Sequence, residues 1–374
     1  MKNAKPPWMT RWVFSPLAGI TLSQWGGLML EHGRHVGLRY VPRSLFTAGM
    51  ALLNSGWSFY ERRRYRSELD SVAVRAPIFV LGHHRSGTTH LWNLLAQDPR
   101  FAYPTILQAV FPHTFLSFER FVHGLAGRFV PNRRPQDNVE MSPDSPLEEE
   151  RALCASTFLS IQMARHFPRR RDAFKPFLSM REASPEARQR WSDALDLFSR
   201  KLLVRHGPEK TLLFKAPDHT AKVDLILQRF PDARFVHIHR DPFTVFLSTR
   251  KMERQTVPLY AYETPPSEGL DAFILWRYRE MYRCYFEDRD RIPPGQLVEV
   301  SFDDLEKEPL DVIERIYEGL GLSDFAGARP RLERYLGGLR GYRKNSYTPL
   351  APSLREEVER SWSPYYERLG YESS

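Results

Sequence analysis

The sequence predicts an α/β fold with a central parallel β-sheet flanked by helices, and three observations support this prediction. Short apolar runs recur at 78–81, 211–215, 234–239 and 297–300, and such runs are typical of strands buried on both faces. The strand–helix–strand spacing across 211–239 is that of a right-handed βαβ unit. The chain has 374 residues, enough for one large domain with an appended segment.

Helices are predicted between the strands. Asp98-Pro99 ends the first, at 90–97, and Gly207-Pro208 ends another, at 185–206. The segment 104–138 is rich in Phe, Pro and Arg, and we expect an irregular excursion over the carboxyl edge of the sheet, where binding loops sit. The other helices are predicted at 145–166, at 220–230, from Pro242 to Arg254, at 271–290, at 302–319, and in a tail from 329 to 371 that is interrupted at 337–349.

Residues 1–76 differ from the rest, and we predict an N-terminal helical segment there and the main domain at 77–374. Two stretches, 13–30 and 44–60, have no charged residue and are flanked by arginines. Gly, Ser, Gln and Asn dilute both, which argues against membrane-spanning helices. Two interpretations stay open: helices packed on the main domain, or a monotopic anchor in which residues 8–66 contact a membrane peripherally.

The composition is that of a globular protein with excess positive charge. The formal net charge is +9, which suits an anionic cofactor, an anionic substrate or a membrane surface. No zinc-finger, RNP or basic-helix pattern appears, so we predict no nucleic-acid partner. The two cysteines, Cys154 and Cys284, are far apart on helix-like stretches. We expect buried thiols in a reducing compartment, hence a cytoplasmic protein.

The strand at 78–81 runs into a glycine loop and then a helix, an arrangement that presents backbone N–H groups to a phosphate. Gly82 and Gly87 have the spacing of a Walker A loop, but two threonines follow where that loop has Lys-Ser/Thr. Without the lysine, we expect an anion other than a nucleoside triphosphate. The loop offers such an anion one guanidinium and three hydroxyls, from Arg85, Ser86, Thr88 and Thr89.

A second anion site is predicted after the strand 234–239. Arg240 follows the strand, and Ser248 lies eight residues later, two turns into the next helix. A guanidinium can bind two phosphate oxygens while a hydroxyl binds the third.

These motifs resemble those of sulfotransferases that use 3′-phosphoadenosine 5′-phosphosulfate (PAPS), in particular the large bacterial branch. GHHRSGTTHL, residues 82–91, is similar to the family's 5′-phosphosulfate loop, except that His84 stands where proline is usual. Arg240 and Ser248 resemble its 3′-phosphate site, and two such sites suit a 3′,5′-bisphosphorylated adenosine. The resemblance covers about 77–371 and implies a three-layer, P-loop-like fold.

The resemblance also implies a set of cofactor residues. Phe302 falls where cytosolic members carry an adenine-side tyrosine, and 342–348 resembles a basic loop that closes over the cofactor. The implied cofactor-binding residues are Arg85, Ser86, Gly87, Thr88, Thr89, Arg240, Ser248, Phe302, Arg343 and Lys344.

The implied reaction is in-line transfer of a sulfuryl group from PAPS to an acceptor hydroxyl or amine. Arg85 is the first candidate to stabilise the departing 5′-phosphate. Lys215, at a strand end beside the loop, is the second, although it could equally form a structural ion pair. Two alternatives stay open for the general base, namely His219 in KAPDHT and the acidic cluster Glu148, Glu149 and Glu150.

Glu148 has another interpretation, because Ser145, Pro146 and Glu148 have the pattern of a capping box that would begin the helix at 145–166. His83 and His84 have no third ligand at metal-site spacing, so we predict no metal.

Two other classes of protein fit the sequence less well. The missing Walker lysine disfavours a P-loop kinase, and the two intact anion sites disfavour a non-catalytic, membrane-associated protein that keeps the fold. The acceptor stays open between carbohydrate, lipid, phenol and peptide.

Overall fold

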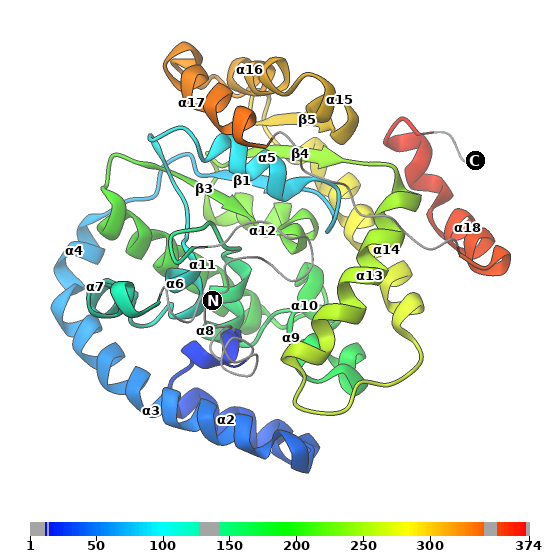
Figure 1. Cartoon of the computed structure of the whole chain (residues 1–374). Coiled ribbons are helices and arrows are strands. Elements are labelled where there is room, and N and C mark those ends of the chain that lie inside the picture. The colour runs from blue at the N-terminus through cyan, green and yellow to red at the C-terminus, as the bar shows by residue number, and fades with distance from the viewer. Residues whose placement is uncertain (1–11, 13–14, 127–141, 340–349, 372–374) are drawn as a thin grey trace, which may run out of the picture. The chain divides into compact units, whose positions relative to one another are not determined.

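The computed structural model describes residues 12, 15–126, 142–339 and 350–371 (Figure 1). The chain forms two compact units. Unit 1 comprises Met1–Ala73, Tyr103–Glu209 and Arg254–Pro266. Unit 2 comprises Val74–Ala102, Lys210–Glu253 and Ser267–Ser374.

Unit 2 contains a five-stranded sheet in which all strands are parallel and the order is β2-β3-β1-β4-β5. The strands are β1 (Ile78–Leu81), β2 (Phe101–Ala102), β3 (Thr211–Lys215), β4 (Arg234–His239) and β5 (Leu297–Ser301). The central strand, β1, is buried along its whole length, and its Phe79 pairs with Phe214 on one side and Phe235 on the other. The four predicted strands are therefore confirmed, and β2 is an addition of two residues.

Helices cover both faces of this sheet, which confirms the three-layer architecture (Figure 1). One layer contains α5 (Thr88–Leu95), α15 (Phe302–Lys307), α16 (Pro309–Gly319) and α17 (Phe325–Gly338). The other contains the 3-10 helix η5 (Pro217–Ala221), α12 (Val223–Arg229) and α14 (Leu270–Asp288). The 3-10 helix η6 (Arg289–Arg291) follows α14, and α18 (Pro352–Arg368) packs on α14. Helix α13 (Pro242–Tyr260) contributes residues to both units.

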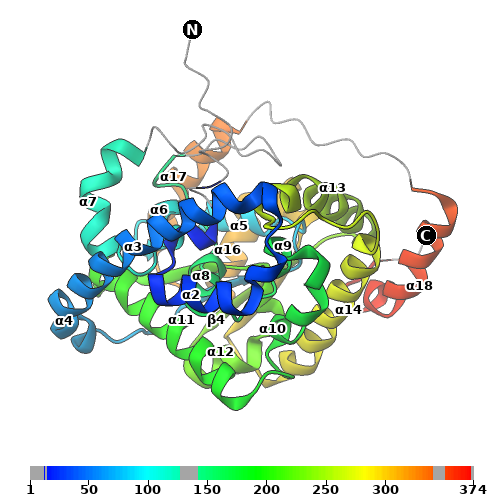
Figure 2. The same cartoon turned by 90° about the horizontal axis from the view of Figure 1, so that it is seen from below.

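Unit 1 is helical in its described part. The N-terminal segment forms η1 (Pro16–Gly19), α2 (Leu22–His32), η2 (Gly33–His35), η3 (Leu38–Tyr40), α3 (Val41–Arg64) and α4 (Arg66–Ser71). The rest forms α6 (Ile106–Val110), α7 (Phe115–Ala126), α8 (Glu150–Thr157), α9 (Met163–His166), η4 (Pro168–Phe174), α10 (Pro176–Ser179) and α11 (Pro185–His206). Helix α2 lies over α8, where the Gln24 side chain donates to the carbonyls of Ala155 (2.9 Å) and Ser156 (2.7 Å) (Figure 2). No helix in the described ranges is long and apolar enough to span a bilayer.

The capping-box prediction at Ser145, Pro146 and Glu148 is wrong. Pro146 instead forms an antiparallel bridge with Thr105, since Ile106 donates its N–H to Ser145 and Leu147 donates to Pro104. Helix α8 therefore begins only at Glu150. It ends at Thr157 because Phe158 takes a left-handed conformation with φ of 60°.

Two other helix predictions are also corrected. The excursion at 104–138 contains α6 and α7, and Thr105 with Gln108 forms the capping box that starts α6. The helix predicted at 302–319 is broken at Glu308, because a residue before proline is pushed out of the helical region.

Candidate active site

The glycine loop between β1 and α5 is a tight, preformed turn. Gly82 and Gly87 have φ of 135° and 101°, a region that side chains with a Cβ rarely enter. A Cβ on Gly82 would lie 2.3 Å from the Ile238 carbonyl oxygen, and one on Gly87 would lie 2.3 Å from the Phe302 ring. Both positions therefore require glycine. The N-terminus of α5 follows at Thr88, so its free backbone N–H groups are next to the loop.

Two hydroxyls hold the loop in shape. The N–H of Gly82 donates to Thr220 Oγ1 at 2.7 Å. Ser86 is fully buried, and its Oγ donates to the His83 carbonyl at 2.8 Å. The hydroxyl hydrogen of Ser86 is thus used within the loop, which gives this residue a structural role beside its predicted one.

Arg85 and Ser248, which belong to the two predicted anion sites, are in direct contact. Arg85 Nε donates to Ser248 Oγ at 2.9 Å, across 163 positions of sequence. Ser248 is buried on α13, and Arg85 sits at the turn of the loop with φ of 72°. The contact means that one anionic ligand could reach both residues.

Phe302 lies between Arg240 and the glycine loop. The guanidinium carbon of Arg240 lies 4.3 Å from the centroid of the Phe302 ring. The same ring packs against Gly87. A cation above an aromatic face is attracted to it, so Phe302 helps to hold Arg240 beside the glycine loop.

Lys215 lies at the end of β3, where it pairs in register with Val80 of β1. Its side chain is buried, with the ammonium 5.1 Å from the centroid of the Trp92 ring. His219 lies in η5 and is fully buried, with its ring 5.8 Å from that of Phe79. Both candidates therefore lie in unit 2 with the loop.

The sequence prediction missed a contact between the loop and η5, in which His84 Nε2 and Asp218 Oδ1 are 3.3 Å apart. Burial alone would raise the pKa of Asp218, but the hydrogen bond and charge of His84, with Lys222 and Arg277, lower that pKa below its usual value. A partial signal was present, because Asp218 lies three residues after the end of β3, at the carboxyl edge of the sheet.

His83 is fully buried and its Nδ1 donates to the His84 carbonyl at 2.9 Å. Burial, with the nearby charges of Arg277 and His84, lowers the pKa of His83 well below its usual value. Among the described residues, no group of three or more His, Cys, Asp or Glu is placed to hold a metal ion.

The acidic cluster lies in unit 1, at the start of α8. Glu149 and Glu150 are fully buried, and Glu150 accepts a hydrogen bond of 2.7 Å from the Ser160 hydroxyl. Glu148 is half-buried. Arg343 and Lys344 lie outside the described residues.

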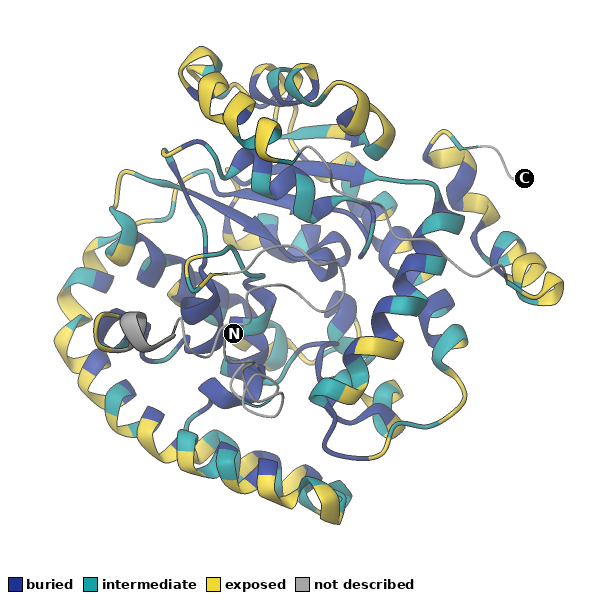
Figure 3. Ribbon diagram, in the orientation of Figure 1, coloured by how far each residue is buried: buried dark blue, intermediate teal, exposed yellow. Residues whose placement is uncertain are grey.

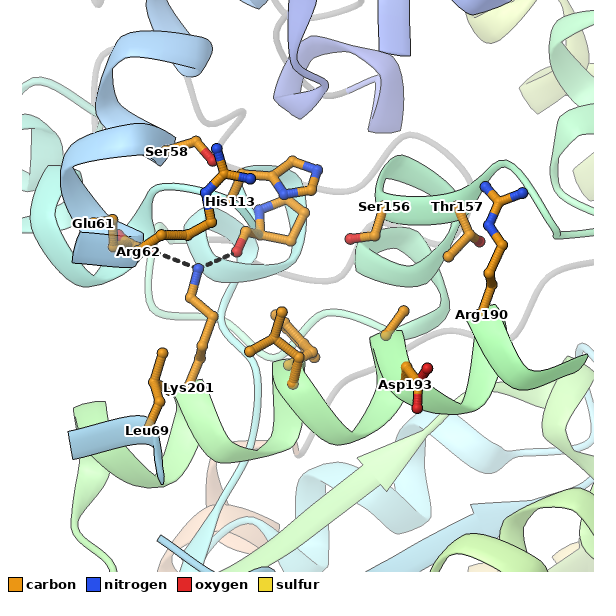
Figure 4. A pocket seen from close by; sticks show the side chains of 14 residues that line it. Ser58, Glu61, Arg62, Leu69, His113, Ser156, Thr157, Arg190, Asp193 and Lys201 are labelled. Atoms are coloured by element: carbon orange, nitrogen blue, oxygen red, sulfur yellow. Dashed lines mark hydrogen bonds and ion pairs between the residues drawn. The ribbon is translucent and has the colours of Figure 1, made fainter. Parts of the chain in front are cut away.

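Unit 1 also has a cavity of about 330 Å³ between α3, α8 and α11 (Figure 4). Lys201 of α11 forms an ion pair with Glu61 of α3 there and donates to the Pro112 carbonyl. Burial and the charge of Lys201 lower the pKa of His113 to about 3. None of the predicted site residues lines this cavity.

Comparisons with sequence families, with curated proteins and with solved structures all identify sulfotransferases. Residues 77–326 match the sequence model of the Sulfotransferase family. The chain is 29% identical, over 362 residues, to the omega-hydroxy-beta-dihydromenaquinone-9 sulfotransferase Stf3 of Mycobacterium tuberculosis (strain CDC 1551 / Oshkosh), covering 96% of this chain and 92% of the relative.

Two solved structures share the fold. Sulfotransferase STF1 from Mycobacterium tuberculosis H37Rv has a TM-score of 0.66 at 20% identity, covering 92% of each chain. Sulfotransferase STF9 from Mycobacterium avium has a TM-score of 0.69 at 19% identity, covering 88% of this chain and 86% of that one.

Proposed function

Because this chain belongs to the sulfotransferase family, we propose that it transfers a sulfuryl group from PAPS to a hydroxyl group of a lipid-like acceptor. Family membership settles the class of enzyme, and the kinase and non-catalytic alternatives are dropped with it. What we propose is the identity of the co-substrate and the chemical class of the acceptor. The observation that carries the co-substrate is the contact of Arg85 with Ser248, which joins the two anion sites that a 3′,5′-bisphosphorylated adenosine needs.

In this proposal the 5′-phosphosulfate binds the glycine loop, and the 3′-phosphate binds Arg240 and Ser248. The loop offers backbone N–H groups at the N-terminus of α5, which favour an anion. Phe302 packs beside the adenine. The remaining proposed contacts are those of Arg85, Ser86, Gly87, Thr88, Thr89, Arg343 and Lys344.

PAPS supplies the sulfuryl group, and the protein supplies positive charge and a base. Arg85 and Lys215 are proposed to stabilise the negative charge that develops on the departing 5′-phosphate. A base takes the proton of the acceptor hydroxyl as the new S–O bond forms. Both alternatives for the base are kept, namely His219 in unit 2 and the cluster Glu148, Glu149 and Glu150 in unit 1. The proposed reaction uses no metal ion.

The acceptor proposal rests on the relative that covers nearly the whole chain, which by its name acts on an omega-hydroxy menaquinone derivative. We propose an acceptor of the same chemistry, a hydroxyl group on a long apolar chain. Such a molecule resides in a membrane. We therefore propose that 77–374 is the sulfotransferase domain of a cytoplasmic enzyme that contacts a membrane peripherally through residues 8–66. Cys154 and Cys284 are buried thiols that form no disulfide, which supports the cytoplasmic location.

The test is turnover of PAPS labelled with ³⁵S, with a polyprenyl alcohol in detergent as acceptor and a water-soluble primary alcohol as the control acceptor. We expect labelled product, separated from PAPS by thin-layer chromatography, from the polyprenyl alcohol alone, and none with labelled ATP in place of PAPS. Equal labelling of the water-soluble alcohol would contradict the acceptor proposal. Phosphoryl transfer from ATP would contradict the co-substrate proposal.

A further inference from the structure

Helix α3 has its polar residues buried and its apolar residues exposed, the reverse of a helix on the surface of a water-soluble protein. The exposed side carries large apolar side chains at helical spacing, with Leu45, Leu52, Leu53 and Phe59 exposed by 64, 61, 61 and 63%. The buried residues of α3 are Arg43, Ser44, Thr47, Ala51, Asn54, Ser58 and Glu61, of which only Ala51 is apolar. Figure 3 shows the exposed residues gathered on one side of this helix.

Hydrogen bonds to the rest of unit 1 fix this orientation. Asn54 Nδ2 donates to the carbonyls of Ala18 (2.8 Å) and Ile20 (3.0 Å). Thr47 Oγ1 lies 2.7 Å from the Tyr262 hydroxyl. Rotating α3 to bury its leucines would leave these polar groups without their partners, which is costly in a protein interior. These hydrogen bonds therefore keep the apolar side of α3 exposed.

The apolar surface continues onto neighbouring elements. Of the eleven large hydrophobic residues exposed in the described part of the chain, ten belong to 22–60 or to α7. Leu30 and Leu38 are 92 and 91% exposed. Phe121 of α7 is 74% exposed, and its ring centroid is 5.7 Å from that of Trp57. We call the following residues the apolar face: Leu22, Leu30, Leu38, Val41, Leu45, Leu52, Leu53, Phe59, Tyr60 and Phe121.

Exposed arginines flank helix α3 at both of its ends. Arg34 and Arg39 precede α3, and a run of three arginines ends it at Arg62, Arg63 and Arg64, all exposed. Glu31 is the single exposed acidic residue between 22 and 64. A large apolar surface framed by positive charge complements the acyl chains and anionic head groups of a bilayer.

A second copy of the chain fits this surface less well. Pairing two apolar faces would bring arginine groups of one copy against arginine groups of the other in either orientation, because both ends of α3 are positive. Like charges facing each other at an interface oppose association. An anionic lipid surface meets no such repulsion.

We propose that the apolar face docks onto an anionic lipid bilayer, with α3 lying in the plane of the interface. Its leucines and phenylalanines enter the acyl boundary, while the arginines at its two ends contact lipid phosphates. The inference deepens the proposed function, since docking would bring the enzyme to a membrane-dissolved acceptor. The docking itself requires neither acceptor nor cofactor.

The test is flotation of the full chain with vesicles of phosphatidylcholine alone or with added phosphatidylglycerol, without PAPS or acceptor. A failure of the proposed catalysis therefore leaves the result unaffected. We expect binding to the anionic vesicles, weakened by salt. The variant Leu45→Gln/Leu52→Gln/Leu53→Gln/Phe59→Gln should lower the partition coefficient by about tenfold or more. The control Leu197→Gln, on α11, changes an exposed leucine outside the face and should bind as the wild type does.

A second variant tests the charges. Arg39→Ser/Arg63→Ser should reduce binding to anionic vesicles by about thirtyfold, on a rule of about 1 kcal/mol per arginine near the surface, and should weaken its salt dependence. Should the quadruple variant melt early, Leu52→Gln and Phe59→Gln are measured singly, each with an expected partial loss. A wild-type protein that stays in the aqueous phase with both vesicles would overturn the proposal. So would a dimer in sedimentation without vesicles that the quadruple variant dissolves.

Discussion

At the scale of single residues, two constraints fix the position of Arg85 in the candidate site. Its φ of 72° lies in the left-handed region, which costs a non-glycine residue roughly 1–2 kcal/mol. Its Nε is bonded to Ser248, which sets the direction of the guanidinium. A residue held under strain and aimed by a buried partner is suited to stabilise charge that develops only in the transition state.

The first prediction concerns this charge. Arg85→Met keeps approximate bulk and removes the cation, so kcat should fall by about 10²-fold or more, because a cation at the bridging oxygen binds the transition state more strongly than the co-substrate. Affinity for adenosine 3′,5′-bisphosphate should fall much less, and Arg85→Lys should recover part of the rate. Arg331→Met, an exposed arginine of α17, is the control. A normal kcat with only a raised KM would reduce Arg85 to a binding residue.

The second prediction assigns Arg240 to the 3′-phosphate. Arg240→Ala removes a charge-assisted fork, so binding of adenosine 3′,5′-bisphosphate should weaken by about 2 kcal/mol or more. Adenosine 5′-phosphosulfate has no 3′-phosphate, and its binding should change far less. Titration calorimetry with both ligands checks this, with Arg331→Ala as the control. Equal losses for the two ligands would place Arg240 elsewhere in the site.

At the scale of elements, the strands and α11 were predictable because their signals are local. An apolar run bounded by polar residues is enough for β1, and the Ser-Pro start and the Gly-Pro end are enough for α11. The start of α8 was not predictable, because the bridge that holds Pro146 is made by Thr105, forty-one positions earlier.

The site, too, was predictable only where its signals are local in the sequence. The glycine loop is a local motif, and spacing placed Arg240 and Ser248 on one strand–helix junction. The pair of His84 and Asp218 was missed because its members are 134 positions apart. The orientation of α3 was also not predictable from the sequence. Its buried face is determined by hydrogen bonds to distant partners such as Ala18 and Tyr262.

The third prediction concerns the ion pair that joins α3 to α11. Burial raises the pKa of Glu61 and lowers that of Lys201, each against the pull of the other's charge. Lys201→Met would leave a buried carboxylate without its cation, so the free energy of unfolding should fall by about 3–5 kcal/mol. Adding Glu61→Gln, which keeps an acceptor for the Ser117 N–H, should restore much of that loss. Urea unfolding of both single variants and the double variant measures the coupling, and purely additive losses would contradict the interpretation.

At the scale of the whole molecule, both units bury histidines that stay neutral. His166 is fully buried in unit 1, and burial with the charge of Arg43 lowers its pKa to about 3. His239 in unit 2 has its pKa lowered to about 4, mainly by burial. A folded pKa below the unfolded value of about 6.5 means that the stability is present above pH 6.5 and is lost as the pH falls toward the folded pKa. Acid should therefore destabilise both units well before the carboxylates titrate.

The last prediction isolates one of these histidines. His166 Nδ1 lies 3.3 Å from the Gln162 carbonyl and carries the proton, so Nε2 accepts from the Ser15 hydroxyl at 3.3 Å. Below pH 6.5 this ring should cost about 1.4 kcal/mol of stability for each pH unit. His166→Gln offers a donor and an acceptor but cannot be charged.

Unfolding free energies of wild type and His166→Gln, measured in urea between pH 7 and 4, should therefore converge or cross as the pH falls. The wild type is the more stable at pH 7, where its imidazole lies near the rings of Tyr260 and Tyr262, at centroid distances of 6.0 and 6.3 Å, and it loses that advantage in acid. His35→Gln, on the 3-10 helix η2, should follow the wild-type curve throughout. Parallel curves for His166→Gln and wild type would show that this ring takes up its proton over the same pH range in the folded and unfolded chains, and that acid destabilisation has another source.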